Sequence, residues 1–129
     1  QSMMLIAKAL QRLERHSEAL EQLEAALKVE LENHSIAMEA SLEAMHLQDL
    51  DKAIHYSEES LKRKPNDLAL LGNHAMTLLV AEKDQEAKEN INNAIKLQPS
   101  DTVNRNIESI INYVLSRKRN RPTFEDTIK

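Results

Sequence analysis

The chain has 129 residues, a length that fits one domain, with 41% hydrophobic but only 2% aromatic residues and a formal net charge of −4. One glycine and three prolines leave few helix breakers, so the composition predicts an almost entirely helical fold with a core of leucine, isoleucine and alanine. The absence of cysteine excludes disulfide scaffolds and thiolate metal sites, and no apolar run approaches the ~20 residues that span a bilayer.

The first predicted element is a pair of helices from about residue 3 to residue 31. Leucines at steps of three, four and seven residues mark an apolar helix face, at Leu10, Leu13, Leu20, Leu23 and Leu27. Ser17 is expected to cap the second helix through its hydroxyl. Gln1-Ser2-Met3 resembles the remnant of a tobacco-etch-virus protease site, so we expect the chain to be part of a longer protein. The sequence leaves the cellular location of the protein unknown, with an intracellular, cytoplasmic location favoured.

Two further helix pairs follow, one over residues 34–64 and one over about 67–97. Apolar residues at helical spacing predict their inward faces, at Ala37, Ala40, Ala44, Leu47, Leu50, Ile54 and Leu61 in the second pair and at Leu71, Leu78, Ile91 and Ile95 in the third. Asp49 is the expected cap at the internal turn of the second pair.

Proline ends two of these pairs, at Pro65 and Pro99, because it lacks a backbone N–H and clashes with the preceding turn. The residues after each proline are expected to start the next helix, with Asn66 and Ser100 as caps and Asp67 and Asp101 at its positive end. In the connection between the first and second helix pairs, Leu31 occupies the position of the proline. Asn33 must then cap alone, and we expect that boundary to be less sharp.

A seventh helix is predicted over residues 102–119. Its apolar stripe consists of Val103, Ile107, Ile110, Ile111, Val114 and Leu115, and its polar face of Asn104, Arg105, Asn106, Glu108, Asn112 and Ser116. Such a helix suits the end of a helical stack, because it covers the last pair and turns polar residues to water. Residues 120–129 lose the periodicity and are expected to form an extended or disordered tail.

The three helix pairs repeat with a constant offset of 34 residues. Small residues occupy three columns at this spacing: Ala7, Ser41 and Ala75; Ala19, Ala53 and Ala87; Ala26, Ser60 and Ala94. A period of this length predicts stacked helical hairpins rather than a closed globule.

This pattern resembles the tetratricopeptide repeat family, with repeats at about 3–33, 34–67 and 68–101 and a capping helix at 102–119. The resemblance implies an all-α, right-handed α-solenoid over residues 3–119. The aromatic residues usual in that family and the glycine at its internal turn are missing here.

The resemblance also implies a concave groove made by the first helix of each repeat, which would bind a peptide or helix of a partner protein. The residues expected to line this groove are Met4, Lys8, Arg12, Met38, Leu42, Met45, His46, Met76 and Leu79. The apolar residues among them should form one patch of a kind that soluble proteins rarely leave exposed. Methionine is flexible and suits adaptable binding of an apolar helix, so we expect a protein-interaction module.

Alternatives to partner binding in this groove remain to be considered. The same patch suits a second copy of the chain, which would make it a homodimer interface, or a further segment of the protein itself. Residues 117–129 hold five basic and two acidic residues, which leaves a charge of −7 on the other 116 residues and argues against nucleic-acid binding by the body of the chain. The basic run at 117–121 is expected to stabilise the end of a helix, with nucleic-acid or phosphate binding as the alternative.

The resemblance makes one ligand class testable, the C-terminal carboxylate of chaperones, which some family members hold with lysine and asparagine side chains. The matching positions are Met4, Lys8, Glu39, Ala69 and Asn73. At none of these positions does the chain carry the residue that the family uses at that particular position. Glu39 would also repel a carboxylate, so binding of a chaperone's C-terminal tail is not expected.

No catalytic, metal-binding or cofactor-binding pattern emerges from the sequence. The five histidines, His16, His34, His46, His55 and His74, include no pair one helical turn apart with a carboxylate at ligand spacing. His16 and His74 fall in columns that normally pack and are expected to be partly buried structural residues. We therefore predict no enzyme, no cofactor, no metal and no small-molecule substrate.

Overall fold

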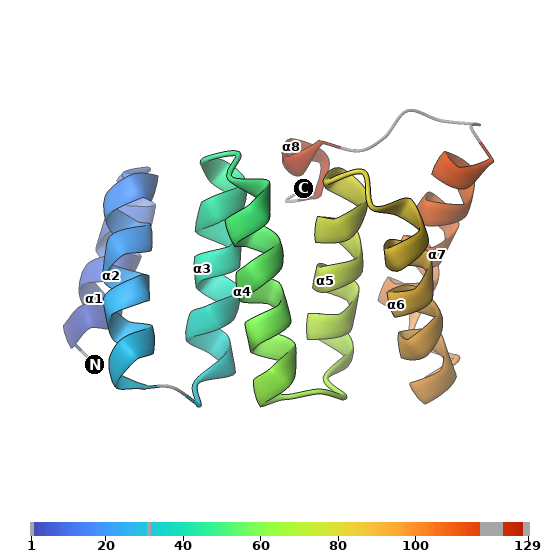
Figure 1. Cartoon of the computed structure of the whole chain (residues 1–129), viewed down its shortest axis with the longest axis horizontal. Helices are drawn as coiled ribbons and strands as arrows, with labels where there is room; N and C mark the ends of the chain where they lie inside the picture. The colour runs from blue at the N-terminus through green and yellow to red at the C-terminus, as the bar shows by residue number, and fades with distance from the viewer. Residues whose placement is uncertain (1, 31, 117–122, 128–129) are drawn as a thin grey trace. The chain divides into compact units, whose positions relative to one another are not determined.

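The computed structural model describes residues 2–30, 32–116 and 123–127 (Figure 1). These residues form two compact units, Gln1–Lys64 and Pro65–Lys129. The first unit contains α1 (Ser2–Arg12), α2 (His16–Val29), α3 (His34–His46) and α4 (Leu50–Arg63). The second contains α5 (Leu68–Val80), α6 (Asp84–Leu97), α7 (Thr102–Leu115) and α8 (Phe124–Thr127). Across the described ranges there is no β-strand, so the all-α prediction is confirmed.

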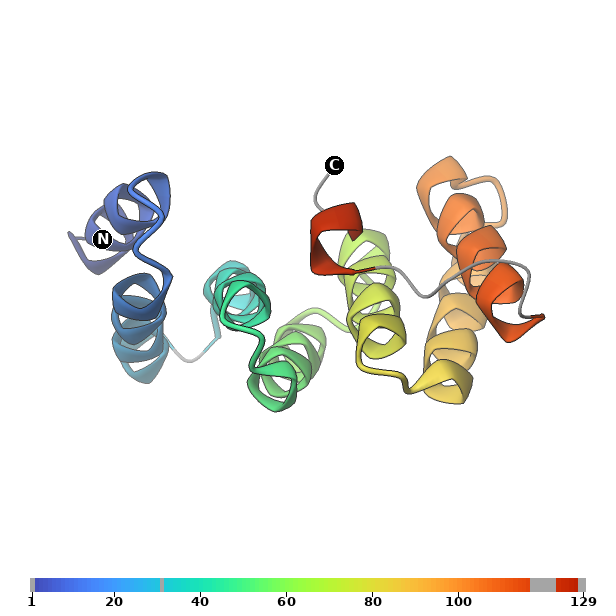
Figure 2. The ribbon, with the colours of Figure 1, turned by 90° about the horizontal axis from the view of Figure 1, so that it is seen from above.

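Helices that follow one another along the chain pack together within each unit. In the first unit α1 packs on α2, α2 on α3 and α3 on α4; in the second, α5 packs on α6, and α7 packs on both of them (Figure 2). The helix boundaries recur every 34 residues, since α3, α5 and α7 begin at His34, Leu68 and Thr102. The predicted arrangement of repeated helical hairpins, a helical-repeat solenoid, is therefore confirmed.

The core of the first unit is built where small residues let α2 and α3 approach. Leu20, Leu23, Ala26 and Leu27 of α2 form one buried cluster with Ile36, Ala37 and Ala40 of α3 and with Ala7 of α1. Ser41 is buried in the same column as Ala7 and satisfies its hydroxyl by donating a hydrogen bond of 2.7 Å to the carbonyl of Ala53 on α4. A serine therefore serves in this column without leaving an unpaired buried group.

Each internal turn adopts the same left-handed conformation, although none contains glycine. Glu14, Gln48 and Glu82 have φ values of 57°, 59° and 65°, at 34-residue spacing. In the second turn the amide of Asp49 donates to the carbonyl of Ala44 at 2.9 Å, and the amide of Gln48 donates to that of Met45 at 3.0 Å. The first and third turns repeat both bonds, which is the Schellman pattern that ends many helices.

The helix caps differ from the prediction at two connections between helix pairs and at one internal turn. The N-cap of α5 is Asp67, whose side chain accepts from the amide of Leu70, and the N-cap of α7 is Asp101, so the expected caps Asn66 and Ser100 are wrong by one residue. Each proline begins a two-residue turn, which moves the next helix start one position along. Ser17 is also not a cap, because α2 already begins at His16. Asp49 caps α4 as predicted.

Asn33 caps the start of α3, as predicted. Asn33 accepts from the amides of both Ser35 (3.0 Å) and Ile36 (3.2 Å). One asparagine therefore satisfies two of the unpaired N–H groups at the start of α3, and no proline is needed to define the boundary.

Four side chains lie on a different face from the one predicted. Leu13, Leu47 and Val103 are exposed, because the first two follow the last residue of their helix and Val103 is in the first turn of α7. Asn104, expected on the polar face, is only 1% exposed and donates to the carbonyl of Leu68 on α5 (3.2 Å) and to the carboxylate of Asp101 (2.9 Å).

The tail also departs from the prediction. Phe124–Thr127 forms a single helical turn, α8, where an extended or disordered tail was expected. Thr123 precedes it and Glu125 lies within it, both residue types favoured at a helix start, while a turn this short gives no apolar periodicity. The basic run 117–121 and the rest of the predicted tail lie outside the described residues.

We expect Gln48→Gly to stabilise the protein by about 0.5–1 kcal/mol, because glycine adopts the left-handed conformation without steric cost. The free energy of unfolding in urea measures the effect. Gln48→Ala is the matched control, since it shortens the side chain but keeps the Cβ and should bring no gain. Equal effects of the two substitutions would contradict the strain argument.

We expect Gly72→Ala to destabilise the second unit by about 1–3 kcal/mol. A Cβ on Gly72 of α5 would collide with Asn104 Oδ1 and lie 3.1 Å from Ile107 Cδ1, both on α7. Adding Asn104→Ala should recover part of the loss in urea denaturation, because it removes the nearest atom. The same loss in both backgrounds would contradict this packing.

Candidate partner-binding surface

The nine residues predicted to line a groove divide between the two units. Seven of them lie on α1 and α3 of the first unit: Met4, Lys8, Arg12, Met38, Leu42, Met45 and His46. The other two, Met76 and Leu79, lie on α5 of the second unit. The two sets are therefore described separately.

On the first unit, polar contacts join the faces of α1 and α3 that carry the predicted residues. Gln11 Nε2 of α1 donates to Glu39 Oε2 of α3 at 3.1 Å, and Lys8 Nζ lies 4.0 Å from Glu39 Oε1. Residues three and four apart lie on one face of a helix. Met4 and Arg12 therefore share a face of α1 with Lys8, and Met38 and Leu42 adjoin Glu39 on α3. We call these helix faces the α1–α3 surface.

The apolar side chains of the α1–α3 surface are accessible to different degrees. Met4, Met38 and Leu42 are half-buried, and Lys8 and Arg12 are exposed. Met45 is only 4% exposed, so its side chain belongs mainly to the core and offers a partner little area. Among the predicted residues of this surface, the accessible apolar ones are Met4, Met38 and Leu42.

A polar cluster closes one end of the α1–α3 surface. The ring of His46 stacks on that of His16 with centroids 4.0 Å apart and planes within 5° of parallel. His16 Nδ1 of α2 in turn shares a hydrogen bond of 2.6 Å with Glu43 Oε2 of α3, a carboxylate that is 3% exposed. His46 was expected to be a rim residue. Its imidazole is exposed, but this stack fixes its position.

In the second unit, the two predicted residues differ in accessibility. Met76 is half-buried and Leu79 has 0% exposure. Leu79 is a core residue here, and charged substitutions at Leu79 or Met45 would therefore test the fold rather than binding. The neighbouring Gly72 lies under Asn104 and Ile107 of α7, so the capping helix covers part of this face of α5.

The described residues contain no candidate metal site. No group of three or more histidine or acidic residues among them is arranged to hold a metal ion. His16 and His74 are partly and fully buried, respectively, which confirms their prediction as packed residues. None of the helices described has both the length and the apolar character needed to cross a membrane.

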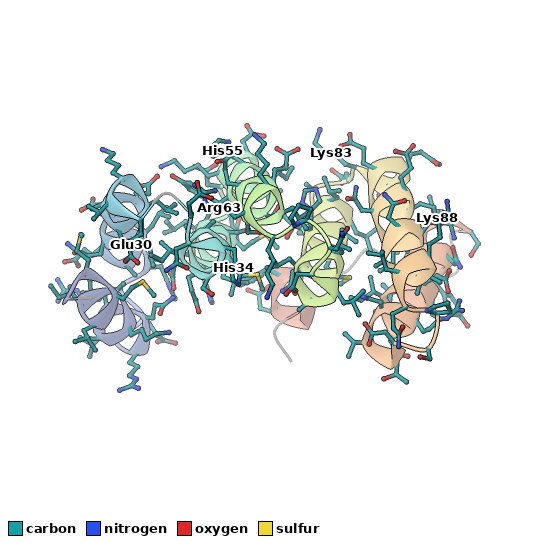
Figure 3. The ribbon with its side chains drawn as sticks, turned by 90° about the horizontal axis from the view of Figure 1, so that it is seen from below. Glu30, His34, His55, Arg63, Lys83 and Lys88 are labelled. Carbon is teal, nitrogen blue, oxygen red and sulfur yellow. The ribbon has the colours of Figure 1, made fainter. Side chains whose placement is uncertain are left out.

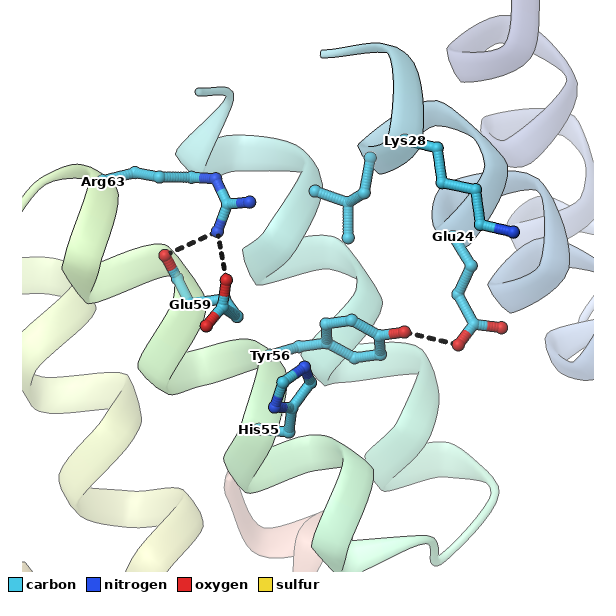
Figure 4. Close-up of a pocket in the computed structure, with 7 residues that line it drawn as sticks. Glu24, Lys28, His55, Tyr56, Glu59 and Arg63 are labelled. Atoms are coloured by element: carbon cyan, nitrogen blue, oxygen red, sulfur yellow. Dashed lines mark hydrogen bonds and ion pairs between the residues drawn. The ribbon is translucent and has the colours of Figure 1, made fainter. Parts of the chain in front are cut away.

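A cleft on another face of the first unit was not predicted. It has a volume of about 380 Å³ between α2 and α4 and is lined by Glu24, Leu27, Lys28, His55, Tyr56, Glu59 and Arg63 (Figure 4). Figure 3 labels two of these residues, His55 and Arg63, on α4. We call it the α2–α4 cleft. The lining residues come from two helices about 30 positions apart, so no local pattern in the sequence brings them together. The sequence feature that could have pointed to this cleft is Tyr56, because aromatic residues are rare in this chain.

The repeated hairpins with buried small-residue columns define an α-helical repeat protein. A family model for the tetratricopeptide repeat matches residues 1–33 and 34–67, more than half of the chain. The chain therefore belongs to the tetratricopeptide repeat family. No curated protein matches the sequence.

Solved structures support the same fold. The first tetratricopeptide domain of Spaghetti (RPAP3), bound to the HSP90 peptide SRMEEVD, is 12% identical with a TM-score of 0.78, covering 89% of this chain and 91% of that chain. The second such domain of human RPAP3, in complex with the HSP70 peptide SGPTIEEVD, is 13% identical with a TM-score of 0.77, covering 86% of this chain and 92% of that chain. At this identity the likeness concerns the fold.

We expect His16→Ala to destabilise the first unit by about 2 kcal/mol, because it leaves the buried carboxylate of Glu43 without its hydrogen-bond partner. The double variant His16→Ala/Glu43→Ala should lose less than the sum of the two single variants, by about 1 kcal/mol. Urea denaturation of the four proteins in this cycle measures the coupling. Additive losses would contradict a direct interaction between the two side chains.

Proposed function

We propose that the chain is a protein-interaction module that binds a peptide or helix of a partner protein on the α1–α3 surface. Two observations support this proposal: Gln11 and Lys8 of α1 contact Glu39 of α3, and the predicted groove residues Met4, Met38 and Leu42 on these helices are only half-buried. An apolar strip with a polar rim gives burial energy to a bound segment and leaves the charges to set its orientation.

Family membership and the solved neighbours support a binding role rather than catalysis. Both neighbouring domains have their structures in complex with short peptides of chaperones. Methionine side chains adapt to apolar ligands of different shapes because they are unbranched and have three rotatable bonds. We infer that a helix or extended peptide with one or two large apolar residues is the ligand class that best fits this surface.

Chaperone tails are a poor match for the same surface. Glu39 projects a carboxylate with 29% of its side chain exposed, and Lys8 lies beside it at 4.0 Å. A peptide ending in an aspartate, such as SRMEEVD, would bring further negative charge toward Glu39, while Lys8 is already partly neutralised. The proposed ligand is therefore an apolar segment that is not anchored by its terminal carboxylate.

Selection from a phage-displayed random peptide library, followed by fluorescence anisotropy on the selected peptides, tests the proposal. We expect peptides with apolar residues at helical or alternating spacing, and we expect Leu42→Glu to weaken their binding at least about tenfold by placing a charge in the apolar strip. Leu42→Glu should not change the anisotropy of labelled SRMEEVD, because this peptide is not a ligand of the α1–α3 surface.

Leu97→Glu is the matched control for this experiment, because Leu97 is an exposed leucine at the end of α6 in the other unit. It should bind the selected peptides like the unmodified chain. Unchanged binding by Leu42→Glu would contradict the proposal. A concentration-dependent dimer in light scattering that Leu42→Glu dissociates would assign the surface to a second copy instead.

A further inference from the structure

The α2–α4 cleft has an apolar and aromatic floor. Leu27 of α2 is buried in the core cluster of the first unit, and the half-buried Tyr56 of α4 packs against that cluster. The exposed imidazole of His55 meets the Tyr56 ring edge to face, with centroids 5.1 Å apart and planes at 62°. Together these groups form a surface on which one large apolar side chain can pack.

The two carboxylates that line the cleft are already neutralised by groups of the chain itself. Glu24 accepts hydrogen bonds from the Tyr56 hydroxyl and, at 3.2 Å, from Lys52 Nζ. Burial, followed by the hydrogen bond and the charge of Glu24, raises the pKa of Tyr56, so the phenol stays protonated and keeps donating.

Glu59 is held in the same way on the opposite side of the cleft. Lys62 Nζ donates to it at 3.0 Å. Arg63 Nη1 donates to it at 3.2 Å (Figure 4). The hydrogen bond from Lys62, with further help from Arg63, lowers the pKa of Glu59. Both lining carboxylates therefore have their charge offset before any ligand arrives.

The charged residues that line the cleft are two cations, Lys28 and Arg63, and two carboxylates, Glu24 and Glu59. Lys52, Lys62 and Arg63 pair with these carboxylates, which leaves Lys28 as the unpaired cation of the lining. Lys28 is exposed at the rim and forms no ion pair with any acidic residue that the structure describes. An incoming carboxylate would find in Lys28 a cation that is not already engaged.

From this combination of an apolar floor and a cationic rim, we propose that the α2–α4 cleft binds a short acidic peptide segment that carries one large apolar side chain. The apolar side chain packs on Leu27 and Tyr56, and a flanking carboxylate pairs with Lys28. This site lies on the second helices of the hairpins and is separate from the α1–α3 surface, so it does not depend on the function proposed for that surface.

The repeat pattern indicates that this site belongs to the first unit alone. At the positions 34 residues before and after Tyr56 the chain has Gln22 and Asn90, and those corresponding to His55 are Glu21 and Glu89. The lysine, by contrast, recurs, with Lys62 and Lys96 in the column of Lys28. Lys96 is also exposed and lies in the other unit, so it provides a matched position that does not line this cleft.

Fluorescence anisotropy with a labelled synthetic peptide, DDFDD, tests the proposal on the full chain. We expect DDFDD to bind, DDADD to bind more weakly because it lacks the ring, and KKFKK not to bind. Lys28→Glu should weaken DDFDD binding by about fivefold or more, whereas Lys96→Glu should leave it unchanged. Binding should also fall as salt is added, because the ion pair is solvent-exposed.

Three results would overturn the proposal: no binding of DDFDD, equal binding by DDFDD and KKFKK, or equal losses from Lys28→Glu and Lys96→Glu. The last would mean that the peptide responds to overall charge and not to the cleft. Leu42→Glu distinguishes the two surfaces, since it should not change DDFDD binding. Circular dichroism of each variant checks that the helices are retained.

Discussion

Close approach of helices through small side chains is the constraint on which the other features of this chain depend. Ala19, Ala53 and Ala87 have no exposed surface and recur at one position in every hairpin. The distance between packed helices follows the size of the side chains between them, so small residues bring neighbouring helices together. In the first unit, this packing sets the α1–α3 surface on one pair of helices and the α2–α4 cleft on the other.

Much of the fold was predictable because it depends on side-chain size repeated at a fixed interval. The features that were not predictable depend on single contacts. Asn104 reads as a surface residue, yet it is buried because its amide reaches Leu68 and Asp101 and because Gly72 leaves room for it. The sequence did not predict the left-handed turns either. The residues that adopt this conformation, such as Gln48, are not the glycine that usually marks such a turn.

The candidate surfaces could be predicted only in part, for a related reason. Helical spacing predicts that Met4 shares a helix face with Lys8, and Met38 with Leu42, but it does not indicate how deep a side chain lies. Met45 is therefore a core residue despite its favourable position in the pattern. The α2–α4 cleft depends on a contact between Tyr56 and Glu24, which are 32 positions apart and belong to different repeats. Spacing within one helix carries no information on such a contact.

The three identical internal turns also determine how the chain tolerates changes in length. The residue after the left-handed position, such as Asp49, both ends one helix and starts the next, so no spare residue separates them. A single inserted residue would rotate the following helix by about 100° relative to its neighbour. Ala53 would then leave the buried column and a larger side chain would take its place. These short loops are on the surface, yet insertions and deletions should be as disruptive there as changes to the core.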